Sequence, residues 1–423
     1  QKTVLDLIVE LTRERGMSTI LITHDLGLAA AYCDRVVVME KGHVVETAAA
    51  EAIFKAPSHA YTKKLMRATP RPGVHLRDLL PEGDAHSPSP RLRGEGRGEG
   101  RQQTPAQASA PHPNPLPTEE WGEGIVAAAA KLNGTTQYPQ PSNREPLLVV
   151  SNLVKEYPRK ALGASLIKLT KSKTNGAAAP EAAVFRAVDG ISFTVHRGES
   201  VGLVGESGCG KSTTSSMVMR LLDHTDGAIM FDGQDIGAIP ARKFAKLDLR
   251  KRIQMVFQDP TDSLNPRFTA ARAIADPLLR FAPDRNAKAI RARSEELATQ
   301  VGLPLDLLDR FPHQLSGGQK ARVGIARAIA LNPDLVILDE PTAALDVSVQ
   351  AVVLNLLQDL KDRLGMSYLF VSHDLNVVRL LCDRVIVMKA GRIVEQGETA
   401  KVLTEPAAEY TRELLSAIPQ PPV

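Results

Sequence analysis

The sequence predicts an α/β fold for residues 145–423, with a mostly parallel sheet covered by helices on both faces. Short apolar runs alternate there with helical stretches, which is typical of parallel strands joined by helices. A glycine-rich turn also joins one of these runs to a helical stretch, and part of the chain repeats itself. We expect strands at 147–150, 201–204, 335–338 and 368–371, with a helix at 349–363 between the last two.

Composition and charge exclude several classes of protein. The 423 residues are 43% apolar, which is enough for two domains with cores. The formal net charge is only +4 and the basic residues are spread among acidic ones, so we expect no nucleic acid as a partner. No apolar run approaches the roughly 18 residues of a membrane helix, and residues 1–10 do not read as a signal peptide. The three scattered cysteines favour a reducing cytoplasm over a disulfide scaffold.

The repeat divides the chain into three parts. Residues 1–72 match the end of the sequence without gaps at an offset of 349, as when Cys33-Asp34-Arg35-Val36 aligns with Cys382-Asp383-Arg384-Val385. We interpret residues 1–72 as the C-terminal remnant of a first domain, with strands that lack their sheet neighbours and that lean on the second domain or are poorly ordered. Residues 73–144 are rich in Pro and Gly and are expected to form a flexible linker, with a docking segment as the alternative. We expect residues 145–423 to form a complete second domain.

A phosphate-binding loop is predicted at residues 205–212, which read GESGCGKS and fit the P-loop pattern G-x-x-x-x-G-K-S between a strand and a helix. Its glycines let the backbone wrap around phosphates, Lys211 should reach the β- and γ-phosphates, and the Ser212 hydroxyl should bind Mg²⁺. Because Cys209 lies beside Lys211 and a helix N-terminus, we expect a lowered thiol pKa and fast alkylation. The predicted ATP contacts are Gly205, Glu206, Ser207, Gly208, Cys209, Gly210, Lys211, Ser212 and Thr213.

Two acidic residues end the apolar run 335–338. A buried parallel strand would deliver both carboxylates to its C-terminal edge, beside the P-loop. Asp339 is then the natural partner of Mg²⁺ through water, and Glu340 is the candidate general base that polarises the attacking water.

The pentad Leu315-Ser316-Gly317-Gly318-Gln319 comes shortly before these acids, and on it the sequence resembles the ATP-binding cassette (ABC) ATPases. The resemblance implies a P-loop NTPase of the ABC type, with an antiparallel β subdomain and a helical subdomain beside the parallel sheet. It also implies that the pentad faces the nucleotide of an opposite cassette. Five further positions match the family's motifs: Gln258 the Q-loop, which also touches Mg²⁺, Asp346 the D-loop, His373 the switch histidine, Tyr157 the aromatic that stacks on adenine and, through the repeat, His24 the remnant switch histidine of the first copy.

Within that superfamily, residues 258–267 and 410–415 resemble the ATPases of peptide and nickel importers. This implies a subunit that binds and hydrolyses ATP, with Mg²⁺, to drive import of di- or oligopeptides. It implies as partners two transmembrane permease subunits, a substrate-binding protein and a second ATPase domain, at the cytoplasmic face of the bacterial inner membrane. Lys320 and Ala321 depart from the usual residues after the pentad. A soluble cassette ATPase of translation or DNA repair and an inactive remnant are the alternatives.

Overall fold

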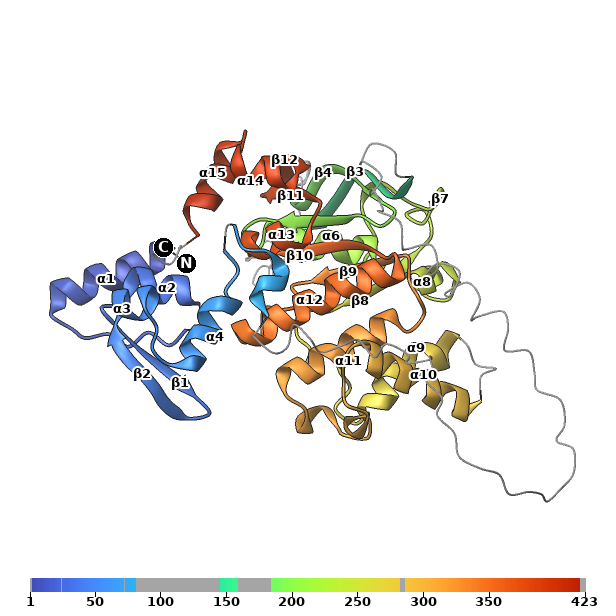
Figure 1. Ribbon diagram of the computed structural model, residues 1–423. Helices are drawn as coiled ribbons and strands as arrows, with labels where there is room; N and C mark the ends of the chain where they lie inside the picture. The colour runs from blue at the N-terminus through green and yellow to red at the C-terminus, as the bar shows by residue number, and fades with distance from the viewer. Residues whose placement is uncertain are drawn as a thin grey trace, which may run out of the picture. The chain divides into compact units, whose positions relative to one another are not determined.

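The computed structural model describes residues 2–23, 25–71, 73–80, 145–158, 184–281 and 286–418. Most of the expected linker therefore lies outside the described residues. The described part of the second domain is built around a six-stranded sheet, an antiparallel sheet and a group of helices (Figure 1).

The central sheet has the strand order β12-β11-β5-β10-β9-β8. Neighbouring strands from β8 to β11 are parallel, and only the edge strand β12 runs antiparallel. This confirms the predicted mostly parallel sheet. The helix after a strand carries the chain back to the edge where that strand began, so the next strand runs parallel to it. The strands are β5 Ser200–Val204, β8 Ile253–Val256, β9 Leu335–Asp339, β10 Ser367–Ser372, β11 Arg384–Lys389 and β12 Arg392–Glu398.

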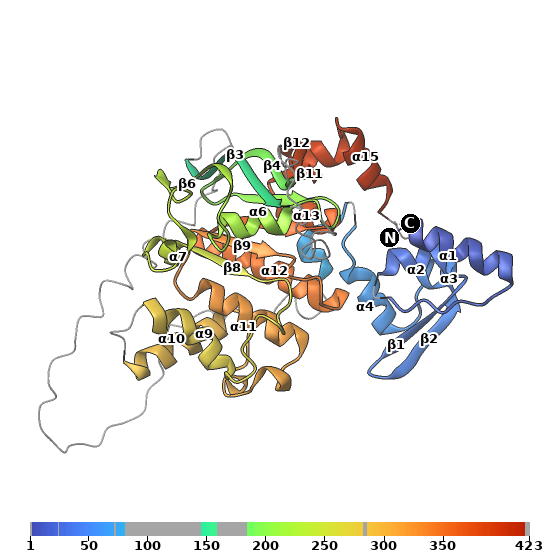
Figure 2. The ribbon, with the colours of Figure 1, turned by 180° about the vertical axis from the view of Figure 1, so that it is seen from behind.

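Side chains of each central strand enter two different cores, one on each face of the sheet. On β9, Val336 and Leu338 belong to one core, whereas Leu335 and Ile337 belong to the other. The first core also takes in side chains of α11 (Gly317–Ile329), α12 (Val347–Leu364) and α13 (Leu375–Leu381). The second takes in α6 (Lys211–Val218) and the antiparallel sheet, and the two sides can be followed in Figures 1 and 2. Burial on both faces explains why these strands are continuously apolar instead of alternating.

Both expected subdomains are present. The antiparallel sheet has the order β4-β3-β6-β7, and its strands are β3 Pro146–Pro158, β4 Val184–His196, β6 Asp226–Phe231 and β7 Gln234–Asp235. The helical subdomain packs α9 and α10 against α11. The remaining helices of the domain are α7 Ala241–Phe244, α8 Leu249–Arg252, α9 Ala270–Phe281, α10 Ala287–Gln300, α14 Thr399–Thr404 and α15 Glu409–Ser416, with 3-10 turns at Leu305–Leu307 and Pro312–Gln314.

The N-terminal segment reproduces the end of the second domain. Its elements are α1 Lys2–Arg15, α2 Leu26–Tyr32, β1 Arg35–Glu40, β2 His43–Ala49, α3 Ala50–Lys55, α4 Ala60–Ala68 and the 3-10 helix η1 Leu76–Leu79. Residues 18–23, which correspond to β10, form no strand, and Ile20 and Ile22 are 90% and 94% exposed. Among the described residues, no sheet neighbours cover these side chains.

The expected boundary of the linker at residue 73 has to be moved. Residues 73–80 are ordered and pack on α12, where Leu79 and Ala68 are buried with Val347 and Ala351. The side-chain amide of Asn355 also donates a hydrogen bond of 2.9 Å to the backbone carbonyl of Leu76. Because these apolar side chains leave water, they offset the entropy cost of ordering the segment. The N-terminal segment thus leans on the second domain through α4 and η1.

Candidate functional site

The P-loop connects β5 to α6, and two of its glycines are required by close packing. A Cβ on Gly205 would lie 2.2 Å from the backbone oxygen of Met388, and one on Gly210 would lie 2.4 Å from that of Ala187. Both glycines also have positive φ angles, 149° and 107°, which residues with side chains rarely adopt. The loop is therefore held against β11 on one side and β4 on the other.

Lys211 lies inside this loop. Its side chain is buried, and its Nζ donates to the backbone oxygens of Gly205 at 2.7 Å and Glu206 at 2.9 Å. Glu206, Ser207, Gly208 and Ser212 are exposed, and Thr213 is half-buried. A buried ammonium beneath an exposed glycine-rich turn at a helix N-terminus offers the positive potential that phosphate groups need.

Cys209 corrects one of the sequence-based expectations. Burial raises the pKa of its thiol, and the Lys211 ammonium, 3.9 Å from the sulfur, opposes that shift without reversing it. The sequence showed the neighbouring cation and the helix N-terminus, but it did not show that the side chain turns into the core beside Gly205. The expectation of a lowered thiol pKa is therefore wrong.

The two carboxylates at the end of β9 lie in different surroundings. Asp339 is buried, and one of its oxygens, Oδ2, accepts a hydrogen bond of 3.4 Å from Ser215. Its other oxygen, Oδ1, is buried without a partner among the described residues. Burial and the neighbouring Glu340 raise the pKa of Asp339. A buried carboxylate oxygen without a donor is costly, and this one fits a divalent cation or the water bound to it.

Glu340 lies between two of the other predicted site residues. Its Oε2 accepts a hydrogen bond of 3.0 Å from Gln258, and its Oε1 lies 3.2 Å from Nδ1 of His373. The hydrogen bond with His373 lowers the pKa of Glu340 and raises that of His373. The three residues follow β8, β9 and β10, which are adjacent in the sheet, so their carboxyl ends bring them together. Glu340 therefore stays ionised near neutral pH.

The pentad 315–319 begins α11 at the surface. Ser316 is the N-cap: its hydroxyl accepts from the Gln319 backbone N–H at 3.3 Å, and the Gln319 side chain accepts from the Ser316 N–H at 2.9 Å. Gly318 passes so close to α12 that a Cβ would lie 2.6 Å from a methyl of Val349. Leu315 is buried, whereas Ser316 and Gly317 are exposed. Among the described residues, the pentad makes no hydrogen bond to the P-loop.

The remaining predicted residues are placed as follows. Tyr157 ends β3 and pairs with Phe185 on β4, two residues before the Ala187 that packs on the P-loop. Its ring is partly exposed, and Lys155 lies over it at 5.2 Å. Asp346 is exposed at the N-terminus of α12. His24 lies outside the described residues. The roles of these residues stay predictions.

Sequence reasoning missed two polar side chains that contact the site. Ser215 bonds to Asp339, as described above. The hydroxyl of Tyr410 accepts from the backbone N–H of Glu206 in the P-loop at 3.3 Å. Ser215 lies one helical turn after Ser212, which is a usable signal in the sequence, but nothing in the sequence connects Tyr410 to a loop 204 residues earlier.

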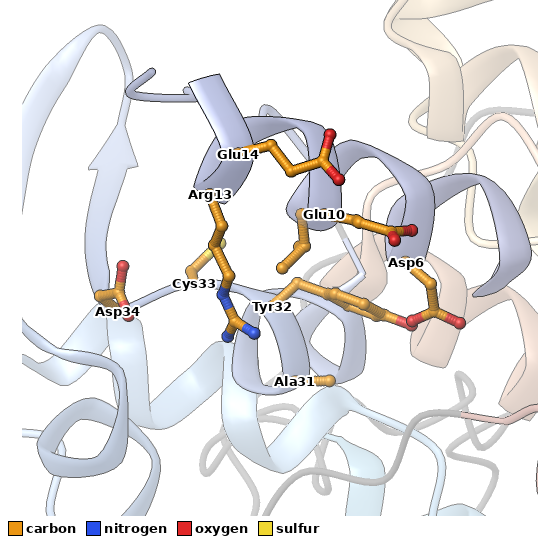
Figure 3. Close-up of a pocket in the computed structure, with 9 residues that line it drawn as sticks. Asp6, Glu10, Arg13, Glu14, Ala31, Tyr32, Cys33 and Asp34 are labelled. Atoms are coloured by element: carbon orange, nitrogen blue, oxygen red, sulfur yellow. The ribbon is translucent and has the colours of Figure 1, made fainter. Parts of the chain in front are cut away.

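A separate cavity of about 530 Å³ lies in the N-terminal segment (Figure 3). It is formed by α1 and the end of α2, and its lining includes Asp6, Glu10, Tyr32 and Cys33. The Tyr32 hydroxyl donates to Asp6 at 2.9 Å. The carboxylates of this cavity do not favour a polyphosphate, and none of the predicted ATP contacts lines it.

The comparisons with known proteins agree with this geometry. Residues 188–343 match the family model "ABC transporter". Residues 45–96 and 394–422 both match "Oligopeptide/dipeptide transporter, C-terminal region", so the two copies of the repeat are found independently. This second match also overlaps the expected linker up to residue 96.

Two curated relatives are glutathione import ATP-binding proteins, GsiA. Those of Pectobacterium atrosepticum and Salmonella typhimurium are 38% identical over 419 and 421 residues, which is 99% of this chain and 59% of each relative. The chain therefore spans less than two thirds of the length of these relatives.

Solved structures show the same fold. The ATP-binding cassette MJ0796, in a dimeric post-hydrolysis state bound to ADP and Pi, is 28% identical, with a TM-score of 0.50 over 60% of this chain and 99% of that one. The cassette cbiO1 of Clostridium perfringens, part of the transporter complex cbiONQ, is 29% identical, with a TM-score of 0.50 over 65% of this chain and 96% of that one.

Proposed function

We propose that this chain, which carries an ATP-binding cassette of the ABC transporter family, hydrolyses ATP to energise the import of di- or oligopeptides or related small peptides. The observation that carries the proposal is the meeting of Gln258, Glu340 and His373 at the edge of the sheet where the P-loop begins. The relatives named for glutathione import and the two matches to the oligopeptide transporter region support the peptide class, since glutathione is itself a small peptide.

The site residues divide the reaction between them. The backbone N–H groups of the P-loop that have no partner within the fold and the Lys211 ammonium bind the phosphates. Glu340 is ionised and accepts a proton from water as the water oxygen bonds to the γ-phosphorus and the bond to the β–γ bridging oxygen breaks. Gln258 orients that water, and His373 donates a hydrogen bond to the γ-phosphate. Gln258 and His373 each lie within hydrogen-bond reach of Glu340.

The described residues also suit Mg²⁺. Ser212 and Gln258 would hold the ion directly and Asp339 would hold it through water, with the unpartnered Oδ1 of Asp339 as the feature that fits. When bound, the ion neutralises charge on the β- and γ-phosphates.

The exposed pentad acts on the nucleotide of a second cassette. A helix N-terminus that presents Ser316 and Gly317 to solvent can bind the γ-phosphate held by another cassette, and the solved cassette with ADP and Pi is dimeric. We place two permease subunits and a substrate-binding protein beside this pair, with the chain peripheral at the cytoplasmic face of the bacterial inner membrane. Within the described ranges, no helix has the length and apolar character needed to cross a membrane.

The test is Glu340→Gln, assayed at concentrations at which cassettes pair. Loss of the general base should lower ATP turnover by about 10²–10⁴-fold while ATP binding is kept. Glu405→Gln, at an exposed glutamate after α14, is the matched control and should hydrolyse ATP like the wild type. Near-normal turnover by Glu340→Gln would show that another group activates the water.

A further inference from the structure

We propose that Tyr410, on the C-terminal helix α15, is a positioning residue that holds the P-loop in its nucleotide-binding conformation. The proposal rests on the proposed ATP-binding function of this domain. Its starting point is the hydrogen bond between the Tyr410 hydroxyl and the backbone N–H of Glu206, with 3.3 Å between nitrogen and oxygen. This bond links the end of the chain to the second residue of the loop.

The contact is built into the core and does not depend on a mobile surface side chain. Tyr410 is only 7% exposed and belongs to the larger of the two cores. The ammonium of Lys389 lies 4.3 Å from the centre of its ring, a cation–π contact. Lys389 directly follows Met388, whose backbone oxygen packs against Gly205. The ring is thus held by the same end of β11 that holds the start of the P-loop.

Both backbone polar groups of Glu206, its N–H and its carbonyl oxygen, are hydrogen-bonded. Its carbonyl oxygen accepts from Lys211 Nζ at 2.9 Å and from the Cys209 N–H at 3.3 Å, and its own N–H is used by Tyr410. If Lys211 turns toward a phosphate, the carbonyl loses its charged donor, whereas the bond to Tyr410 remains. The Tyr410 hydroxyl can therefore keep the loop in place while the lysine changes partners.

A second contact from the C-terminal region supports the same inference. The backbone N–H of Gly391, in the turn between β11 and β12, donates to the carbonyl oxygen of Cys209 at 3.0 Å. The two contacts use the N–H of Glu206 and the carbonyl oxygen of Cys209, so they occupy no N–H group of Ser207, Gly208 or Gly210. The region matched by the oligopeptide transporter C-terminal model, residues 394–422, contains α15. In this chain it therefore braces the nucleotide site.

The repeat supplies a matched control. Tyr61, on α4, stands at the position of Tyr410 in the first copy, and it too is partly covered. The sequence holds a single P-loop, so the hydroxyl of Tyr61 has no equivalent loop to hold in this chain. Tyr61→Phe and Tyr410→Phe each remove one oxygen atom from a related helix.

The experiment compares the full chain with Tyr410→Phe and Tyr61→Phe by hydrogen exchange of peptides covering residues 201–212 and by titration with a fluorescent (mant) ATP and Mg²⁺. We expect Tyr410→Phe to speed exchange at the Glu206 amide and to raise the Kd for the nucleotide about 3–10-fold, the usual worth of one hydrogen bond. Tyr61→Phe should leave both unchanged. The turnover of the nucleotide-saturated protein should fall less than the affinity, which separates positioning from a catalytic role.

Four outcomes decide between the possibilities. Unchanged exchange and affinity in Tyr410→Phe would overturn the proposal, as would faster exchange with unchanged affinity. Faster exchange throughout residues 184–418, with a lower urea midpoint, would reassign Tyr410 to general stability and overturn it too. If the wild type binds no nucleotide while exchange at Glu206 still responds to Tyr410→Phe, the ATPase function fails and the contact stands, so the two failures are distinguishable.

Discussion

Residues 26–68 and 375–417 are two copies of one structure in a single chain. Each has a helix, a β-hairpin and two short helices in the same order. Even the irregularity in the hairpin is shared: the register shifts between Val38 and Met39 in the first copy and between Val387 and Met388 in the second, at the same offset of 349. Local sequence is therefore sufficient to form these elements and to set their register.

The two copies differ in how deeply equivalent side chains are buried. Met39 is 56% exposed, whereas Met388 is fully buried. The reason is the partner of the hairpin, because β11 pairs with β5 on its other edge, while β1 pairs only with β2 among the described strands. The elements are therefore local properties of the sequence, while the core and the candidate site come from strands distant in the chain. Matched substitutions in the two copies can test this.

The largest expected difference concerns His373 and His24, the two histidines predicted to be switch histidines. His373→Ala should lower ATP hydrolysis by about 10²-fold or more, the cost of removing one charge-stabilising donor, because His373 lies beside Glu340. His24→Ala should leave hydrolysis unchanged, since no acidic strand end accompanies His24 in its copy. The measurement is steady-state phosphate release at equal protein concentration. A comparable loss from His24→Ala would mean that the first copy takes part in the reaction.

The next difference concerns stability. Met388→Ala should lower the free energy of unfolding by about 2–5 kcal/mol, because it leaves a cavity in a packed core. Met39→Ala, the same change at a half-exposed position, should stay within about 0.5 kcal/mol. Urea unfolding followed by circular dichroism measures both. Equal losses at the two positions would show that Met39 is covered by a partner in solution.

A smaller difference is expected among the cysteines. Burial raises the pKa of all three thiols, but only Cys33 is half-exposed, whereas Cys209 and Cys382 are buried. We expect iodoacetamide at pH 8 to label Cys33 at least about ten times faster than the other two, because the thiolate must form and be reached. Mass spectrometry of peptides after timed quenching gives the three rates. Fast labelling of Cys209 would restore the original sequence-based expectation.

The sequence alone was sufficient to predict the parts of the candidate site whose residues are neighbours in the chain. Pattern and spacing put residues 205–212 between a strand and a helix and the two acids at the end of an apolar strand, and the structure has them after β5 and at the end of β9. The fold class followed for the same reason, since alternating strands and helices leave few arrangements of a parallel sheet.

The parts that could not be predicted depend on which side chains the fold buries. The environment of Cys209 is set by its packing beside Gly205 and below β11, so a neighbouring lysine suggested the wrong sign of the pKa shift. The order of residues 73–80 depends on Leu79 meeting α12, although their composition resembles that of a linker. The contact of Tyr410 with Glu206 spans 204 residues of sequence, beyond the reach of any local pattern.

The smallest expected effect should be the same in both copies, because it depends on hydrogen bonds between residues that are close in the sequence. Glu46 accepts from the backbone N–H groups of Ser58 and His59 at 2.7 and 3.1 Å, and Glu395 accepts from those of Ala407 and Ala408 at 2.8 and 3.1 Å. Hydrogen bonds led by that of the Ser58 hydroxyl lower the pKa of Glu46 to about 2. Burial opposes ionisation of Glu395, but the hydrogen bonds it accepts still lower its pKa.

Each carboxylate therefore fastens the turn before a helix, α4 or α15, only while it is ionised. Because the folded-state pKa is lowered, this stabilisation is present above the ordinary carboxyl pKa of about 4.3 and is lost as the pH falls toward about 2 for Glu46. Glu46→Gln and Glu395→Gln should each speed hydrogen exchange in the following turn a few-fold at pH 6, and the difference from the wild type should shrink as the acid is titrated. Exchange at matched peptides of both copies, read in one sample, is the measurement. A response at Glu395 without one at Glu46 would show that even this local clamp needs the completed sheet beneath it.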